Sequence, residues 1–128
     1  MRYWTFDAVQ LIADEDKIKR NLISITAQLD TAREMAAHPD EFGVDKSELP
    51  LYIELLEMRQ HEFQMYLDMI TLGMNNLPEA ERLILRWWIQ EGYDDDFIIE
   101  HAAIKSQREL EKIKRISLEK FKRLVMPR

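Results

Sequence analysis

The sequence predicts an all-α protein in which a long helical hairpin is followed by a trihelical helix-turn-helix domain. Three Gly and four Pro in 128 residues, with a charged fraction of 33%, favour long amphipathic helices over tight turns and sheet. Apolar residues recur at helical spacing along most of the chain, and polar or helix-breaking clusters separate these stretches. We expect the hairpin, a candidate dimerisation region, within residues 1–75 and the helix-turn-helix domain within residues 76–128.

The first long helix is predicted to begin at the acidic run Asp14–Asp16, because carboxylates favour a helix N-terminus. Apolar residues then recur at spacings of four and three, as in the seam of a coiled coil. This seam consists of Ile18, Leu22, Ile25, Leu29, Ala32 and Ala36. The helix should therefore pack on another helix. Residues 38–46, with Pro39 and Gly43, are expected to form a loop.

The second long helix is predicted to start with Ser47 as its cap, to tolerate Pro50 in its first turn and to end near Leu72. It carries two apolar stripes, which is more than one partner helix requires, so a second contact surface is implied. The first stripe holds Tyr52, Leu56, Phe63, Tyr66 and Ile70, and the second holds Leu51, Leu55, Met58, Met65, Met69 and Leu72. Met58, Met65 and Met69 are either core filler or a partner surface, and they make a homodimer a candidate assembly.

Three shorter helices are predicted after the hairpin. The first starts at Pro78 and ends at Gly92, and the second is capped within the run Asp94–Asp96. Ser106 is expected to cap the last helix, which continues to about Val125. Its inward stripe is predicted to hold Leu110, Ile113, Ser117, Leu118, Phe121 and Val125, and its outward face Gln107, Arg108, Glu111, Lys112 and Arg115.

Charge is distributed unevenly along the chain. The formal net charge is −6, which by itself argues against nucleic acid. Residues 105–128, however, carry nine Lys or Arg against three Glu, a balance of +6 that leaves −12 for the rest of the chain. Such asymmetry is typical of a nucleic-acid-binding end joined to an acidic body, and the alternative is a merely solvated helix face.

Several classes of protein are disfavoured. The chain has no Cys, so a disulfide framework, a thiolate zinc site and a Cys nucleophile are excluded. Met1–Trp4 opens no apolar signal core, and charge interrupts every apolar stretch before it could span a bilayer, so a cytoplasmic protein without membrane contact is expected. His38, His61 and His101 show no metal-binding spacing, and no catalytic or cofactor motif is present, so we expect neither metal, cofactor, small-molecule substrate nor enzyme activity.

Three segments of the C-terminal part carry a resemblance to a known module. They are Leu77–Arg86, Glu91–Tyr93 and Ile113–Phe121. Together they resemble the C-terminal helix-turn-helix of bacterial sigma factors, called region four. A protein of this size with two acidic helices ahead of such a module resembles the phage-encoded transcriptional regulators of the ArpU and RinA type. The resemblance covers about two fifths of the chain and implies a DNA-binding regulator that recognises promoter DNA through its last helix.

In those families the first two turns of the last helix face the bases, and flanking Lys and Arg contact phosphates. The resemblance therefore assigns Ser106, Gln107, Arg108 and Lys112 to the bases and Lys105, Lys114 and Arg115 to phosphates. The chain departs from the pattern because Ala102–Lys105 replaces the usual Gly of the turn and because Glu109 and Glu111 would repel phosphate. We expect weak DNA binding by a monomer, supplemented by a second copy or another protein.

A second hypothesis assigns the same fold to protein binding. In that hypothesis the chain contacts host RNA polymerase or another host protein, and its acidic surface keeps it off DNA. Trp87 and Trp88 lie about 100° apart on a helix, so Trp87 is expected in the core and Trp88 partly exposed, either at the domain edge or on a partner surface. A purely structural helical bundle is the third and least favoured hypothesis.

Overall fold

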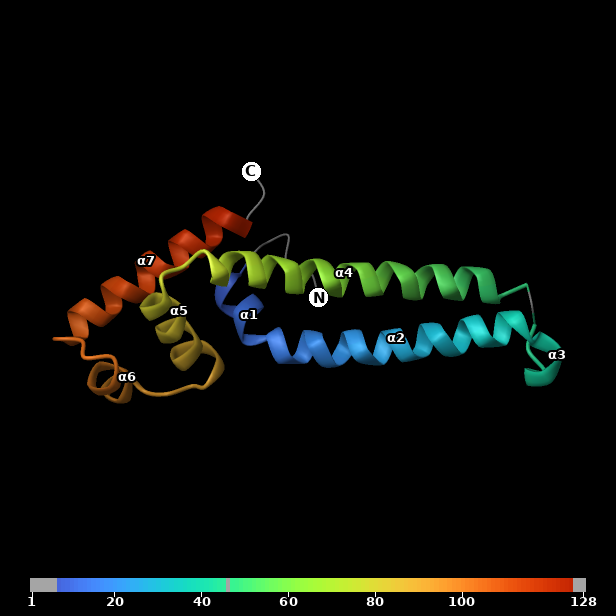
Figure 1. The fold of residues 1–128 in the computed structure, drawn as a ribbon, viewed down its shortest axis with the longest axis horizontal. Helices are drawn as coiled ribbons and strands as arrows, with labels where there is room; N and C mark the ends of the chain where they lie inside the picture. Colours follow the sequence, from blue (N-terminus) through green and yellow to red (C-terminus); the bar gives the residue numbers. More distant parts are fainter. Residues whose placement is uncertain (1–6, 46, 126–128) are drawn as a thin grey trace. The chain divides into compact units, whose positions relative to one another are not determined.

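The structure, a computed structural model, describes residues 7–45 and 47–125, and every regular element in these ranges is a helix (Figure 1). The all-α prediction is confirmed for this part of the chain. The chain divides into two compact units: one spans Asp16–Leu67, and the other joins the segment ending at Glu15 to the chain from Asp68 onward. Met1–Trp4, Lys46 and Arg128, which the sequence analysis included, lie outside the described residues.

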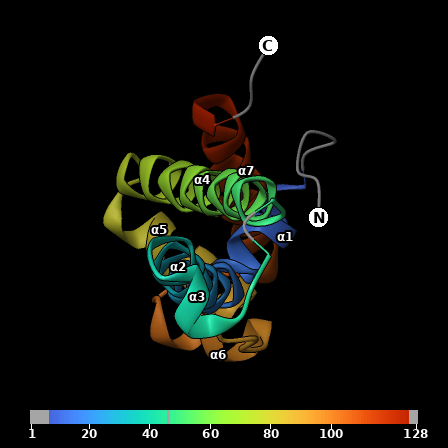
Figure 2. The ribbon, with the colours of Figure 1, turned by 90° about the vertical axis from the view of Figure 1, so that its right-hand side faces the viewer.

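The first unit is built on two long helices, α2 (Glu15–Ala37) and α4 (Leu49–Asn75), whose parts within Asp16–Leu67 lie side by side and run in opposite directions (Figures 1 and 2). Polar contacts across the pair include the Arg33–Glu57 ion pair at 3.2 Å and a 3.2 Å hydrogen bond from Gln60 to Thr26. Their apolar core consists of Ile25, Leu29, Ala32 and Leu56, with Ile53 and Phe63 packed against it. Of the predicted seam, Ile18, Ile25, Leu29 and Ala32 are buried, Leu22 is half-buried and Ala36 is exposed.

The connection between α2 and α4 differs from the expected loop. Pro39–Phe42 forms a short helix, α3, with Pro at its start and Gly43 at its end with a φ of 63°. Ser47 does not cap α4, which begins at Leu49. The amide and the hydroxyl of Ser47 instead donate to the Asp45 carboxylate at 2.9 and 2.8 Å. These two hydrogen bonds lower the pKa of Asp45 below its usual value, and the bond from the Ser47 amide has the larger effect.

The second unit begins with a helix that the sequence analysis did not identify. This helix, α1 (Ala8–Ala13), is capped by Asp7, which accepts a hydrogen bond from the Gln10 amide at 3.2 Å, and it buries Leu11 and Ile12 completely. Gln90 donates to the Ile12 carbonyl at 3.1 Å and ties α1 to the C-terminal part of the chain. The unit boundaries therefore differ from the predicted division at residues 75 and 76, because the described residues up to Glu15 group with the chain from Asp68 onward.

Four further elements belong to this unit: α5 (Glu79–Leu85), the π-helical turn η1 (Arg86–Gln90), α6 (Asp95–His101) and α7 (Gln107–Val125). A single helix from Pro78 to Gly92 was expected, but its second half is η1. Ile84 from α5, Ile98 from α6 and Leu110 from α7 meet in one buried cluster, with Trp87, Trp88, Phe97 and Ile113 among the residues packed against it. The three helices thus share one core.

The end of α4 contributes to the same unit. The helix continues to Asn75, three residues beyond the predicted end, and the Asn76 side chain donates to the Leu72 carbonyl at 2.8 Å. Gly73 faces the ring of Phe121, and a Cβ atom built on Gly73 would overlap that ring. Phe121 is itself completely buried. The absence of a side chain at Gly73 therefore allows α7 to lie close to α4.

The turn between α6 and α7 contains a residue in the left-handed conformation. Ala103 has a φ of 54°. The Ala102 amide donates to the Ile98 carbonyl at 2.9 Å, and the Ile104 amide donates to the Ile99 carbonyl at 3.0 Å, so this backbone course is fixed on both sides. A non-Gly residue in this conformation costs about 1 kcal/mol.

We expect Ala103→Gly to raise the free energy of unfolding by about 0.5–1 kcal/mol, because Gly adopts positive φ without strain and this outweighs its greater freedom in the unfolded chain. Urea unfolding followed by circular dichroism measures the change. Ala102→Gly is the matched control, since Ala102 has a φ of −95° and should only lose stability on the same substitution. Equal losses in the two variants would contradict a strained Ala103.

Candidate nucleic-acid interface

The start of α7 is fixed by a pair of hydrogen bonds between side chains and backbone. The Ser106 hydroxyl accepts from the Glu109 amide at 3.1 Å, so the predicted cap is confirmed. In return the Glu109 carboxylate accepts from the Lys105 amide at 2.9 Å. This reciprocal arrangement satisfies two amides at the helix end. The Ser106 hydroxyl is therefore engaged as a cap, although the sequence analysis assigned it to a DNA base.

Burial divides α7 into two faces. Leu110, Ser117, Phe121 and Val125 are buried, whereas Ile113 and Leu118 are half-buried, which agrees with the predicted inward stripe. The residues expected to point outward are all exposed: Gln107, Arg108, Glu111, Lys112 and Arg115. One residue behaves differently from its assignment: Lys114 lies on the inward face and is buried.

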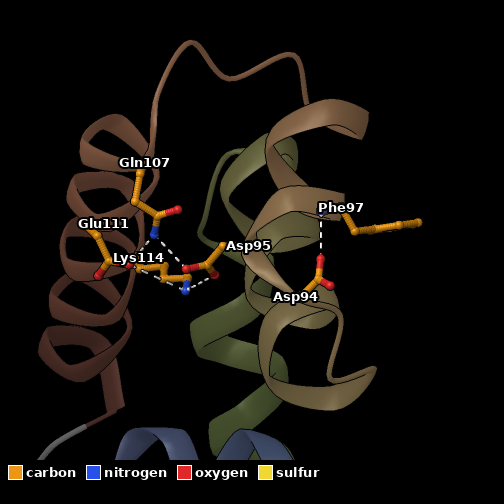
Figure 3. A network of polar contacts seen from close by, with 6 residues as sticks. All are labelled: Asp94, Asp95, Phe97, Gln107, Glu111 and Lys114. Atoms are coloured by element: carbon orange, nitrogen blue, oxygen red, sulfur yellow. Dashed lines mark hydrogen bonds and ion pairs between the residues drawn. The ribbon is translucent and has the colours of Figure 1, made fainter.

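Lys114 is held inside a polar network between α6 and α7 (Figure 3). Its ammonium group lies 2.7 Å from an Asp95 oxygen, 3.8 Å from Glu111 and 4.6 Å from the centroid of the Trp88 ring. Only 10% of the Lys114 side chain is exposed. The expectation that Lys114 contacts phosphate is therefore corrected, because its charge is already neutralised by Asp95 and sheltered by an aromatic ring.

Gln107 takes part in the same network. Its amide nitrogen donates to Asp95 at 2.6 Å and to Glu111 at 3.0 Å (Figure 3). The bonds from Lys114 first, and then from Gln107, lower the pKa of Asp95 below its usual value. Gln107 is exposed, but its side-chain N–H groups could contact a base only after giving up these two hydrogen bonds. Asp95 thus competes with any ligand for Gln107.

The remaining cations of α7 fall into two groups. Lys120 donates to both carboxylate oxygens of Glu81 at 3.0 Å, and Lys122 lies 4.0 Å from Glu119. In the other group, Arg108, Lys112, Arg115 and Arg123 are exposed, and none has an ion pair or hydrogen bond from its side chain within residues 7–45 and 47–125. We call these four residues the basic stripe.

The spacing of the basic stripe places its members on one side of α7. Arg108, Lys112 and Arg115 are four and three residues apart, and Glu119 and Arg123 continue the same side at intervals of four. At 100° per residue, this side is centred opposite the buried residues Leu110 and Phe121 of the same helix. The stripe extends for about 22 Å, because each residue advances an α-helix by 1.5 Å. A row of exposed cations that have no ion pair in the described part of the chain matches the chemistry of a phosphate backbone, and Glu119 interrupts this row.

The exposed side chain of Lys105 precedes α7 and adds a further cation at this end. Glu109 and Glu111 lie in the same first turns, which lowers the local positive potential. These carboxylates therefore lie beside the cations of the stripe at Arg108, Lys112 and Arg115. The sequence analysis named these three residues, but it did not include Arg123.

An aromatic cluster lies on the exposed side of α6. Tyr93, Phe97 and His101 follow one another at ring-centroid distances of 4.3 and 3.9 Å, and the Trp87 ring meets Phe97 edge-on at 5.7 Å. Tyr93 is 40% exposed. The sequence analysis missed this cluster, although the spacing of four residues between its members was a usable signal. Trp87, expected in the core, is only half-buried because it contributes to this surface.

The remaining partner-surface residues differ in exposure. Met58 and Met65 are 61% and 44% exposed, whereas Met69 is half-buried. Trp88 is half-buried, and its ring lies under the Lys114 ammonium group, so this face of Trp88 is not a free surface. Among the described residues, no group of three or more His, Asp or Glu has the geometry to hold a metal ion. No helix in the same ranges combines the length and apolar character that a membrane crossing requires.

No family model, curated protein or solved structure matches this chain.

Proposed function

We propose that this protein is a DNA-binding transcriptional regulator of phage or prophage type that recognises promoter DNA with α7. The observation that carries the proposal is the basic stripe: four cations that have no partner among the described residues lie on one face of a helix whose opposite face is buried. In a chain of net charge −6, this concentration of positive charge on one helix face suits an anionic ligand. The mechanism is recognition and recruitment, without catalysis.

The network around Asp95 refines the roles of the residues. Arg108 and Lys112 lie in the first two turns of α7 and are the residues proposed to reach base edges, where Arg binds guanine through two hydrogen bonds. Arg115 and Arg123, further along the stripe, are proposed to contact phosphates. Lys114 and Ser106 act through the structure by holding α7 in place.

On random duplex DNA, where no specific base sequence is read, all four cations of the basic stripe are proposed to neutralise phosphates, and this implies a specific salt dependence. The logarithm of the association constant should fall with the logarithm of salt concentration with a slope of about −3 to −4, which corresponds to one released counterion per neutralised phosphate. Glu109, Glu111 and Glu119 lower the affinity, so binding by one copy at physiological salt should be weak.

The test compares charge reversal on and off the stripe. Arg108→Glu/Lys112→Glu should weaken binding to a fluorescent random duplex by tenfold or more at low salt and make the salt slope less negative by about 2. The matched control is Lys17→Glu/Arg20→Glu, which makes the same two substitutions at exposed positions of α2. Fluorescence anisotropy at several salt concentrations measures both quantities.

Equal losses of affinity in the two variants would show that only the net charge matters and would overturn the assignment to α7. Absence of duplex binding by the unaltered protein at low salt would overturn DNA binding altogether. That outcome would favour the second candidate function, a protein-interaction module that contacts RNA polymerase or another host protein. The observation in favour of this alternative is the aromatic cluster with its exposed Tyr93. The exposed residues Asp94 and Asp96 follow Tyr93 closely in the sequence.

A further inference from the structure

One face of α4 within the Asp16–Leu67 unit is apolar and exposed. It consists of Leu51, Leu55, Met58 and Met65, whose exposed fractions are 62%, 51%, 61% and 44%. We call these four residues the outer seam. Their spacings are four, three and seven residues, so they occupy the a and d positions of a heptad pattern, with Glu62 at the intervening a position.

The outer seam is not part of the contact between α4 and α2. That contact uses Ile53, Leu56 and Phe63, together with the Gln60 side chain. At 100° per residue, the two sets of residues lie on nearly opposite sides of α4. The outer seam is therefore a second helix-packing surface, and α2 leaves it uncovered.

We propose that the outer seam is covered by the outer seam of a second copy of this chain, with the two α4 helices antiparallel. In the register that pairs Leu55 with Met65 of the second copy, Met58 lies opposite Glu62 of the second copy. Arg59, the next residue, then comes within reach of that Glu62 carboxylate. The twofold axis repeats this ion pair, so the assembly contains two of them.

Charge supports this occupant and this orientation. Arg59 is exposed and has no ion pair within residues 7–45 and 47–125, and the Tyr66 hydroxyl donates to Glu62 at 3.0 Å and holds its carboxylate at the flank of the seam. A parallel pair would bring the two Glu62 carboxylates together. It would also superimpose the acidic end of the hairpin, which contains Asp40, Glu41, Asp45, Glu48 and Glu54. The antiparallel pair separates these like charges.

The size of the seam sets the expected strength. Stable interfaces bury about 800 Å² on each partner, and four side chains on one helix supply less than this. The dimer should therefore be reversible, with a dissociation constant on the order of micromolar. This inference does not depend on DNA binding.

Sedimentation equilibrium over a range of protein concentrations tests the assembly. The unaltered protein should change from monomer to dimer, and Leu55→Lys/Met58→Lys should stay monomeric up to at least tenfold higher concentration. Ile23→Lys/Leu83→Lys is the matched control, because it places two Lys at other exposed apolar positions, which are 72% and 40% exposed. It should dimerise like the unaltered protein. Circular dichroism checks that all variants keep their helices.

Cysteine cross-linking tests the orientation, and the absence of native Cys makes it specific. An oxidised mixture of the Leu55→Cys and Met65→Cys proteins should form the mixed disulfide dimer. Each protein alone should form little disulfide dimer, because the Cys residues of the two copies then lie about 15 Å apart along the helix axis. Self-cross-linking of each variant alone would overturn the antiparallel arrangement. A monomer at every concentration, or a dimer that Leu55→Lys/Met58→Lys leaves intact, would overturn the proposal.

Discussion

Phe121→Ala is expected to destabilise the protein by about 3–5 kcal/mol, the largest effect that we predict for a single substitution. Phe121 is completely buried on α7 and packs against the backbone of α4 at Gly73. Removal of the ring loses its burial and leaves a cavity between two helices that cannot fully collapse. Denaturant unfolding followed by circular dichroism gives the change in the free energy of unfolding.

The close approach at Gly73 adds a sharper test. Gly73→Ala alone should lower stability by about 1–3 kcal/mol, because the added methyl group overlaps a ring that has no room to move, and this exceeds the better helix propensity of Ala. In the Phe121→Ala background the same substitution should become neutral or stabilising. Additive effects of the two substitutions would contradict the contact. Gly43→Ala is an unsuitable control because Gly43 has a φ of 63°.

Asp95→Ala is expected to destabilise the protein by about 2–3 kcal/mol. It leaves the Lys114 ammonium group, with 10% of its side chain exposed, without its closest counter-ion. An unpaired buried charge costs several kcal/mol, and the 35% exposure of Asp95 reduces that figure. The same unfolding experiment measures the loss.

Two comparisons distinguish the loss of the Asp95–Lys114 ion pair from the loss of any carboxylate at the start of α6. Asp96→Ala removes an exposed carboxylate from the same helical turn and should change stability by less than about 0.5 kcal/mol. Lys114→Met in the Asp95→Ala background should recover most of the lost stability, because it removes the stranded charge and keeps the apolar stem. No recovery would mean that Asp95 acts mainly through Gln107.

The pH dependence provides an independent readout of the same pair. The pKa of Asp95 is lower in the folded state than in the unfolded chain, where it is about 4. The stabilisation of the fold by the Asp95 carboxylate is therefore complete above about pH 4 and is lost as the pH falls through the lower pKa of the folded state. Asp95→Asn should therefore lose less stability than the unaltered protein when the pH falls below about 4.

Local features of the chain were predictable because they depend on neighbours in sequence. Asp94 caps α6 by accepting from the Phe97 amide at 2.8 Å, and Ser106 caps α7, both as expected. The outward positions of Arg108 and Lys112 follow from periodicity alone. Periodicity also places Lys114 on the buried face, four residues after Leu110, but the resemblance to region four assigned Lys114 to phosphates.

Other features were not predictable in the same way. The helix α1 has only six residues, which is too short to be stable by itself, so its existence depends on the contact of Leu11 and Ile12 with distant parts of the chain. Similarly, the approach of Phe121 to Gly73 involves residues far apart in sequence. No local pattern reports such contacts.

The sequence by itself determined that the chain is helical, where two of the helices are capped and which side of the last helix is polar, because each of these properties is set within a few turns of backbone. The tertiary structure decided which cations remain available: Asp95 neutralises Lys114 from α6, Glu81 neutralises Lys120 from α5, and Arg108, Lys112 and Arg115 are left without partners in the described part of the chain. The physical reason is that an ion pair depends on the distance between charges in space, and folding brings together carboxylates and cations that are 19 or 39 residues apart in sequence.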